Sequence, residues 1–207
     1  MKQLATLAVL AWSVTARGDG VPLGSVATDA LTPIDTMPNP TYLDTVFAND
    51  TLTNLRSLAL DADPTAPVDF GVQLRAIRTL VTYCPDPSVG PCGVGTIAHD
   101  TLSAIVDGYG TTGTATPRDV LRLRAAIEAL GLAGRSAGLD ADVGRIDQFL
   151  SHQSRDIRTT TAKALGSLCN TQAQLPLRVR LQSEQIPQVQ LAISAALRDL
   201  GTGQCPH

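Results

Sequence analysis

Few side chains in this sequence are suited to chemistry, and those few lie far apart. Two of the three histidines, His99 and His152, fall inside the part of the chain that shows helical periodicity. His99 directly precedes Asp100, but adjacent residues of a helix point in different directions, so we do not expect a ready-made pair. We also expect no serine nucleophile on a sharp turn, and therefore no enzymatic activity and no catalytic residue. The alternative is a catalytic site assembled from distant residues, because such a site needs no sequence motif.

The second group of reactive side chains comprises four cysteines, Cys84, Cys92, Cys169 and Cys205. Four cysteines allow three pairings, and an even number in an exported chain favours disulfides. Cys84 and Cys92 bracket a proline-containing loop, while Cys169 and Cys205 each follow the last helix of a predicted unit, so we predict these two bridges. Zinc sites usually need close cysteine pairs or nearby histidines, so we predict no metal site. Cysteines held in disulfides would not serve as nucleophiles.

A glycine-rich stretch from Gly108 to Gly113 fits the G-x-G-x-x-G pattern of dinucleotide-binding loops. That pattern works only after a β-strand and at the start of a helix within a βαβ unit. The residues before Gly108 show helical periodicity instead, and the next helix is expected to begin only at Pro117. We therefore predict a turn between two helices here, and no cofactor.

The elements that would position these side chains follow a repeating pattern. Apolar residues recur at three-and-four spacing in four segments, residues 72–80, 123–131, 157–165 and 189–197. Their anchor leucines, at positions 80, 130, 165 and 197, are separated by 50, 35 and 32 residues. A period in this range is typical of two-helix solenoid units. A polar turn and a candidate partner helix precede each segment, and these partner helices span residues 52–60, 97–106, 143–150 and 175–181.

The clearest copy begins at Asp156, a carboxylate that suits a helix N-terminus. One face of this expected helix is predicted to be buried and carries Ile157, Thr161, Ala164, Leu165 and Leu168. The other face is predicted to point away from the core and carries Arg158, Thr159, Lys163 and Ser167. The small residues Ala162 and Ala164 would let a neighbouring helix approach closely.

The run Asp156-Ile157-Arg158-x-x-x-Ala162-x-Ala164-Leu165-Gly166 resembles the second helix of a HEAT repeat, in the short bacterial form related to the phycobilin-lyase repeats. The resemblance covers roughly residues 50 to 201 and implies an all-α fold, a solenoid of about four helix pairs that forms a HEAT-like superhelix. HEAT-like arrays mostly act as binding surfaces and scaffolds, so the resemblance implies protein–protein interaction. The alternative is an enzyme or lyase-like accessory protein that uses the solenoid groove as a pocket.

The second helices of the units would present their outward polar side chains to a partner. The predicted binding residues are Arg75, Arg78, Arg124, Glu128, Arg158 and Lys163. This set is mostly basic, so we expect the partner to be another protein with an acidic surface. The whole chain has a formal net charge of -3 and few aromatic residues, so we expect no nucleic-acid partner.

The N-terminus predicts export from the cytoplasm. Lys2 and an apolar run over residues 4–14 precede small residues that a signal peptidase would cut before Arg17, so residues 1–16 are predicted to be a signal peptide. The alternative is a first buried helix. Prolines predict an extended arm over residues 17–41, and the HEAT-like domain is predicted to span residues 42–207. No later apolar run approaches the roughly 20 residues that span a bilayer, so the expected location is periplasmic or secreted.

Overall fold

The computed structural model describes residues 29–32, 38–48, 50–61, 67–84, 92, 95–111, 116–136 and 140–203. Every regular element in these ranges is helical, as predicted. The α-helices are α2 (Pro40–Val46), α3 (Thr51–Leu60), α4 (Phe70–Thr79), α5 (Ile97–Asp107), α6 (Pro117–Ala133), α7 (Asp140–Asp147), α8 (Arg155–Ser167), α9 (Gln174–Ser183) and α10 (Pro187–Thr202). The 3-10 helices are η1 (Leu80–Tyr83), η2 (Gly134–Ser136), η3 (Gln148–Ser151) and η4 (Thr171–Ala173). Across the described ranges, no helix combines the length and the apolar character that crossing a bilayer requires.

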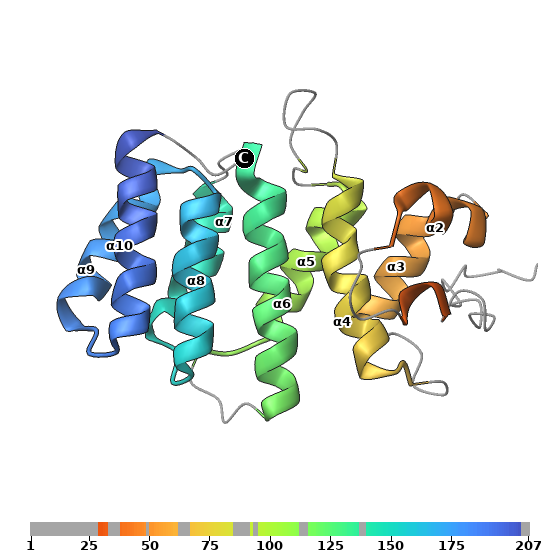
Figure 1. The fold of residues 1–207 in the computed structure, drawn as a ribbon, viewed down its shortest axis with the longest axis horizontal. Coiled ribbons are helices and arrows are strands. Elements are labelled where there is room, and N and C mark those ends of the chain that lie inside the picture. Colours follow the sequence, from red (N-terminus) through yellow and green to blue (C-terminus); the bar gives the residue numbers. More distant parts are fainter. Residues whose placement is uncertain are drawn as a thin grey trace, which may run out of the picture.

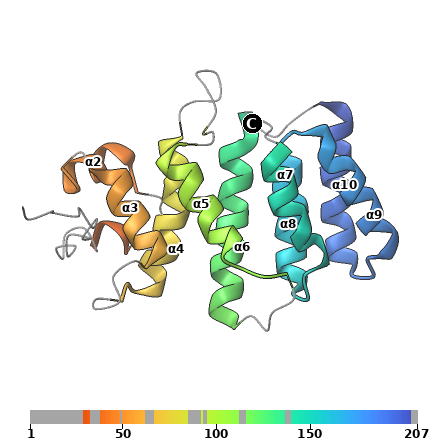
Figure 2. The same ribbon diagram turned by 180° about the vertical axis from the view of Figure 1, so that it is seen from behind.

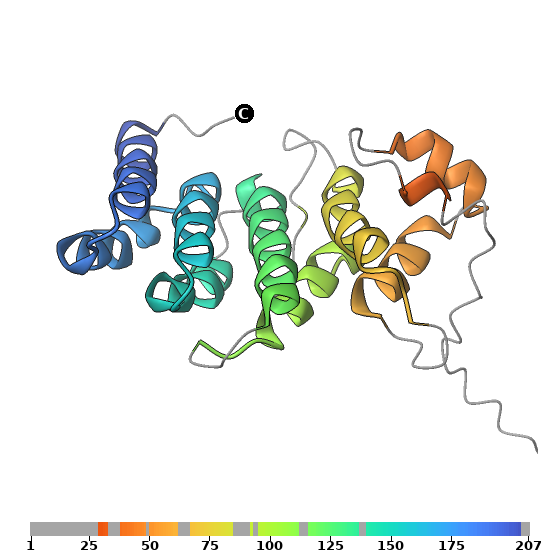
Figure 3. The same cartoon turned by 60° about the horizontal axis from the view of Figure 1, so that its bottom comes forward.

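The helices form two layers (Figure 1). Helices α4, α6, α8 and α10 lie side by side in one layer, and Figure 2 shows the other layer, which contains α3, α5, α7 and α9. Consecutive helices pair across the layers, α3 with α4, α5 with α6, α7 with α8, and α9 with α10. Figure 3 shows both layers from a third direction, with α2 at the end beside α3. Each pair therefore packs mainly against the pairs before and after it.

The eight helices predicted from the apolar periodicity are all present. The caps explain where two of them begin. The Asp69 carboxylate accepts the backbone N–H groups of Gly71 and Val72 at 2.8 and 3.3 Å at the start of α4. Thr116 and Asp119 form a capping box at the start of α6, whose first residue is Pro117, as predicted.

Most of the extended arm expected over residues 17–41 lies outside the described residues, but residues 29–31 are helical and the last two residues belong to α2. Pro40 is the first residue of this helix, and the Asn39 side chain accepts the N–H of Thr41 at 2.9 Å. Proline suits this position because the first helical N–H has no partner within the helix. Leu43 and Phe47 then join the hydrophobic core. The predicted signal peptide, residues 1–16, lies outside the described residues.

Helix α8 packs against α6, α7 and α10, and its five predicted core residues are all buried. A Cβ atom added to Gly131 of α6 would lie 2.7 Å from both Cα and Cβ of Ala164. A Cβ atom added to Gly166 would lie 3.0 Å from Cβ of Ala196 on α10. Small side chains therefore set the close approach of α8 to its neighbours on both sides, as predicted for Ala164.

Candidate functional site

Arg158, predicted to point outward, is buried instead and joins two helix pairs. The residue is 8 % exposed. Its Nε and Nη2 donate to the two carboxylate oxygens of Glu184 at 2.8 and 3.1 Å, and its Nη1 donates to the backbone carbonyls of His152 and Gln153 at 2.8 and 2.9 Å. Thr159 is buried as well. The prediction assumed one buried face, but α8 is covered from three sides by α6, α7 and α10.

Glu184, which directly follows α9, completes this buried cluster. Arg180 donates to its Oε2 from Nε and Nη2 at 3.0 and 2.6 Å, and the N–H of Ile186 donates to its Oε1 at 3.0 Å. Burial alone would raise the pKa of Glu184. The hydrogen bonds from Arg158, Arg180 and Ile186 outweigh burial and lower the pKa from 4.5 to about 2. The carboxylate is therefore ionised at neutral pH and holds α8 against the end of α9 through its hydrogen bonds.

Three other predicted residues, Arg124, Glu128 and Lys163, line one groove between α6 and α8. The groove has a volume of about 200 Å³, and its remaining lining residues are Leu132, Thr160, Ala164 and Ser167. Arg124 and Glu128 lie one turn apart on α6, and Lys163 comes from α8. Within the described part of the chain, the five polar side chains of this groove make no hydrogen bond or ion pair. The structure therefore brings half of the predicted site together, with its polar groups available.

A second groove lies on the other side of α8, between α8 and α10. Its volume is about 240 Å³, and it is lined by Lys163, Gly166, Ser167, Ala192, Ala195, Ala196 and Asp199. Lys163 and Ser167 line both grooves. Most of the other lining residues are small because α8 and α10 approach closely at Gly166 and Ala196. The two grooves, which we call the α6–α8–α10 surface, therefore meet at Lys163.

The remaining predicted residues, Arg75 and Arg78, lie on α4. Arg78 is exposed and Arg75 is half-buried. Helix α4 packs against α6 in the same layer, but the two arginines line neither groove of the α6–α8–α10 surface. They belong to the same layer of helices as the grooves, and the structure does not bring them into the grooves themselves.

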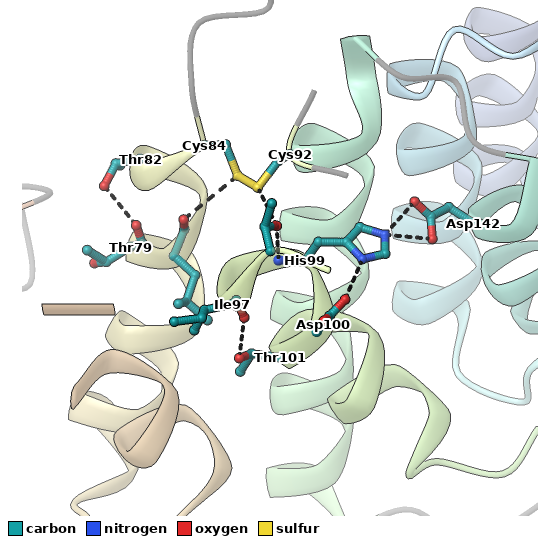
Figure 4. The surroundings of a disulfide bond; sticks show 11 residues. Thr79, Thr82, Cys84, Cys92, Ile97, His99, Asp100, Thr101 and Asp142 are labelled. Carbon is teal, nitrogen blue, oxygen red and sulfur yellow. Dashed lines mark hydrogen bonds and ion pairs between the residues drawn. A yellow bond between two sulfur atoms is a disulfide. The ribbon is translucent and has the colours of Figure 1, made fainter. Parts of the chain in front are cut away.

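A buried cluster around His99 links α5 to α7 (Figure 4). His99 Nε2 lies 3.1 and 3.0 Å from the two carboxylate oxygens of Asp142, and its Nδ1 lies 3.3 Å from Oδ1 of Asp100. Arg145 donates to Asp142 at 2.9 Å and to Asp107 at 2.8 Å. The expectation that His99 and Asp100 would not pair is wrong, because the Asp100 carboxylate turns back toward the imidazole within the first turn of α5.

His99 and His152 are both buried, and their ring nitrogens contact groups of the fold. The hydrogen bond to Asp142 raises the pKa of His99, although burial opposes the rise. His99 is 2 % exposed, and both of its ring nitrogens face carboxylates. His152 is also buried, and its Nδ1 accepts the N–H of Ser154 at 3.0 Å. Burial and the charge of Arg158 lower the pKa of His152.

A disulfide between Cys84 and Cys92 joins the end of η1 to the segment before α5, as predicted (Figure 4). Cys92 Sγ lies 3.7 Å from Thr96 Oγ1, and this hydroxyl accepts the N–H of His99 at the start of α5. The bridge therefore anchors the chain beside the helix that carries His99. Cys169 is also disulfide-bonded, and its predicted partner, Cys205, lies outside the described residues.

Two sequence motifs have settings that do not match their chemistry. Gly108 directly follows α5, so the G-x-G-x-x-G stretch begins after a helix rather than after a strand. No serine nucleophile was predicted from the sequence, but a G-x-S-x-G pattern does occur from Gly134 to Gly138. This pattern is a signal for such a nucleophile. The nucleophile elbow is a strand-to-helix turn, whereas η2 directly follows helix α6. Among the described residues, no group of His, Cys, Asp and Glu side chains is placed to hold a metal ion.

Two members of the groove, Leu132 and Thr160, were not predicted from the sequence. Thr160 carries no charge and is 6 % exposed, so neither charge nor an outward position indicated it. A signal was nevertheless present in the sequence. Thr160, Lys163 and Ser167 follow one another at three-and-four spacing, which places them along one face of α8.

Comparisons of the chain with protein families, with curated proteins and with solved structures find no match. The functional interpretation therefore depends on the geometry of the site itself.

Proposed function

We propose that this protein is an exported binding module of the HEAT-repeat type, which holds another protein in the cell envelope or outside the cell. The proposed contact face is the layer of α4, α6, α8 and α10. The pairing of consecutive helices in two layers supports a solenoid, because solenoid units pack mainly on their sequence neighbours. The Cys84–Cys92 disulfide supports an oxidising compartment, periplasmic or secreted.

One observation carries the proposal, and it concerns the groove between α6 and α8. Its five polar side chains have no partner among the described residues, and the apolar side chain of Leu132 is exposed beside them. By contrast, Arg145, Arg158 and Arg180 are all paired with carboxylates. This groove therefore offers charged, hydroxyl and apolar contacts to a partner from two neighbouring helices.

An enzyme that uses the groove as a pocket is the alternative function. The groove does carry two acid–base groups, Glu128 and Lys163, but no described residue hydrogen-bonds either side chain and so could orient or activate it. The imidazole of His99 is buried and has carboxylates at both ring nitrogens, and His152 is buried as well. The binding module is therefore the better supported of the two functions.

Recovery of a partner from envelope and secreted fractions tests the proposal. The bait is the full oxidised chain, and mass spectrometry identifies and quantifies what it retains. Charge reversal of Arg124 and Lys163 to Glu should reduce the recovered partner at least tenfold, because both side chains are exposed in the groove. Arg158 is not a suitable target, since its replacement would leave Glu184 buried without its main partner.

The matched control is Arg178→Glu, which reverses an exposed arginine on α9 in the other layer. This variant should retain the partner at the level of the unaltered chain. Equal loss in Arg178→Glu and in the groove variant would indicate non-specific charge effects. A partner retained fully by the folded groove variant would remove this face from the proposal.

A further inference from the structure

We propose that the groove between α6 and α8 binds an acidic segment of a polypeptide, with a carboxylate of that segment placed between Arg124 and Lys163. This inference rests on the proposed function, because it assigns a chemical character to the partner at the same face.

The two cations of the groove lack counter-ions, although acidic residues outnumber basic residues in the chain. The sequence contains 19 acidic and 16 basic residues. Even so, Arg124 and Lys163 have no carboxylate within salt-bridge distance among the described residues, and Glu128 pairs with neither of them. Together with Glu128, these two cations give the groove a net charge of +1, which an incoming carboxylate would neutralise.

The hydroxyl groups of the groove add uncommitted hydrogen-bond donors. Thr160 is more than nine-tenths buried, and its side chain makes no hydrogen bond with any described residue. Its neighbour Thr159 behaves differently and donates to the carbonyl of Arg155, four residues earlier, at 2.9 Å. Ser167 is likewise without a hydrogen-bond partner in the described part of the chain. A hydroxyl without a protein partner gains most from a partner that is charged.

Glu128 and Leu132 indicate a peptide rather than a simple anion. Glu128 can only accept hydrogen bonds, so it needs a donor such as a backbone N–H group. The exposed Leu132 and the neighbouring Ala164 offer an apolar contact. A polypeptide supplies a carboxylate, N–H donors and apolar atoms together, whereas phosphate supplies a negative charge but neither N–H donors nor apolar atoms. An anionic membrane fits less well, because Glu128 and Asp199 would face its headgroups.

The second groove predicts how the segment continues beyond Lys163. Its small lining residues on α10 leave room for a chain that crosses α8, and Asp199 lies at its far side. Asp199 is paired with Arg198 on α10 but would still repel a second acidic cluster. We therefore expect acidic residues of the partner over α6 and neutral or basic residues over α10. Helices pack about 9 Å apart, so a segment of about eight extended residues spans the three helices.

Labelled peptides of about this length test the inference by fluorescence anisotropy with the full oxidised chain. One peptide carries Glu with Ala and Leu, a second has each Glu replaced by Gln, and a third has each Glu replaced by Lys. The Glu peptide should bind at least tenfold more tightly than the other two. Arg124→Gln and Lys163→Gln should each weaken its binding about tenfold, which corresponds to about 1.4 kcal/mol. Arg178→Gln should change the affinity less than about twofold.

A coupling experiment then locates the carboxylate. Apart from Lys2, Lys163 is the sole lysine of the sequence. A carbodiimide, which condenses a carboxylate and an amine to an amide with loss of water, should therefore join the Glu peptide to Lys163. Peptide mapping by mass spectrometry would identify the joined residues, and Lys163→Gln should abolish the product. Coupling at another site, or undiminished coupling in Lys163→Gln, would overturn the inference.

The failure of this inference differs from the failure of the proposed function. One outcome is equal affinity for the Glu and Gln peptides, together with NMR chemical-shift changes at the backbone amides of Thr160 and Ser167. This outcome would overturn the acidic character of the partner but support the proposed binding face. If no peptide binds and no partner is recovered, both the acidic-segment inference and the proposed binding function are overturned. Inorganic phosphate and phosphatidylglycerol vesicles serve as further probes. Binding of either one that needs Arg124 and Lys163, without binding of the Glu peptide, would overturn the polypeptide assignment.

Discussion

At the scale of single residues, the buried carboxylate of Glu184 sets the first prediction. Glu184→Gln leaves the guanidinium groups of Arg158 and Arg180 beside each other without a counter-ion. Breaking a buried ion pair in this way should lower the free energy of unfolding by about 3 kcal/mol, measured by urea denaturation at neutral pH. The matched control is Glu128→Gln, the same change at an exposed and unpaired position, which should cost less than about 0.5 kcal/mol. Similar costs for the two variants would contradict the assigned role.

The same carboxylate predicts a loss of stability in acid. The pKa of Glu184 falls from 4.5 to about 2 on folding, so its stabilising contribution is fully present above about pH 4.5. That contribution should disappear as the pH falls from about 4.5 to about 2. The difference in unfolding midpoint between the unaltered chain and Glu184→Gln should therefore shrink over this range. A difference that stays constant in acid would show that the ionised carboxylate is not the source of the stabilisation.

His99 and His152 should give stability profiles with opposite slopes. The pKa of His99 is raised above 6.5, so its contribution is complete below about pH 6.5 and is lost as the pH rises through the raised value. The pKa of His152 is lowered, so its contribution is present above about pH 6.5 and is lost as the pH falls. Urea midpoints of His99→Gln and His152→Gln, each compared with the unaltered chain from about pH 5 to about pH 9, should show this contrast. Parallel profiles would contradict it.

The contacts of single residues were the least predictable part of the site. Arg124, Glu128 and Lys163 could be predicted because exposed positions follow from helical periodicity alone. The roles of Arg158 and His99 could not, because their partners are 26 and 43 residues away in the sequence. Helical periodicity shows which face of a helix is apolar, but it does not show which polar residues of a neighbouring unit will cover the rest.

At the scale of the elements, the sequence predicts the helices well and their surroundings less well. The eight repeat helices follow from three-and-four spacing, and the start of α6 follows from Pro117. Helix α2 was missed because the prolines at and before its start argued against a helix, although Pro40 occupies the one position where proline fits. The burial of α8 was underestimated, because a helix packed on three sides has little outward surface left.

Helix packing predicts opposite effects for two Gly→Ala substitutions. Gly131→Ala places a Cβ atom 2.7 Å from Ala164, so α6 and α8 must move apart. The cost should be about 1 to 3 kcal/mol, as for other overpacked cores. Gly144→Ala, within α7, meets no atom within 4 Å and should instead stabilise the protein by up to about 1 kcal/mol. Thermal unfolding monitored by circular dichroism measures both, and a stabilised Gly131→Ala would contradict the close approach of the helices.

At the scale of the whole molecule, a polar contact lies at each junction between neighbouring helix pairs, partly buried at the first and buried at the other two. Arg122 of α6 donates to the carbonyl of Ala59 in α3 at 3.0 Å, which joins the first pair to the second. His99 and Asp142 join the second pair to the third, and Arg158 and Glu184 join the third to the fourth. Apolar packing between similar helices would tolerate sliding, whereas directional hydrogen bonds fix one register. The array therefore presents the two grooves beside α8 in a defined arrangement.

Because each pair packs mainly on its neighbours, damage at one junction should stay local. Hydrogen exchange of Glu184→Gln should show faster exchange in α9 and α10, while α3 to α5 keep their protection. Arg122→Met removes the contact with Ala59 and should show the reverse pattern, with faster exchange in α3 and α4. Each variant serves as the control for the other. Uniform acceleration over all helices in both variants would mean that the array unfolds as one unit, and the four pairs would then lack the independence that a solenoid requires.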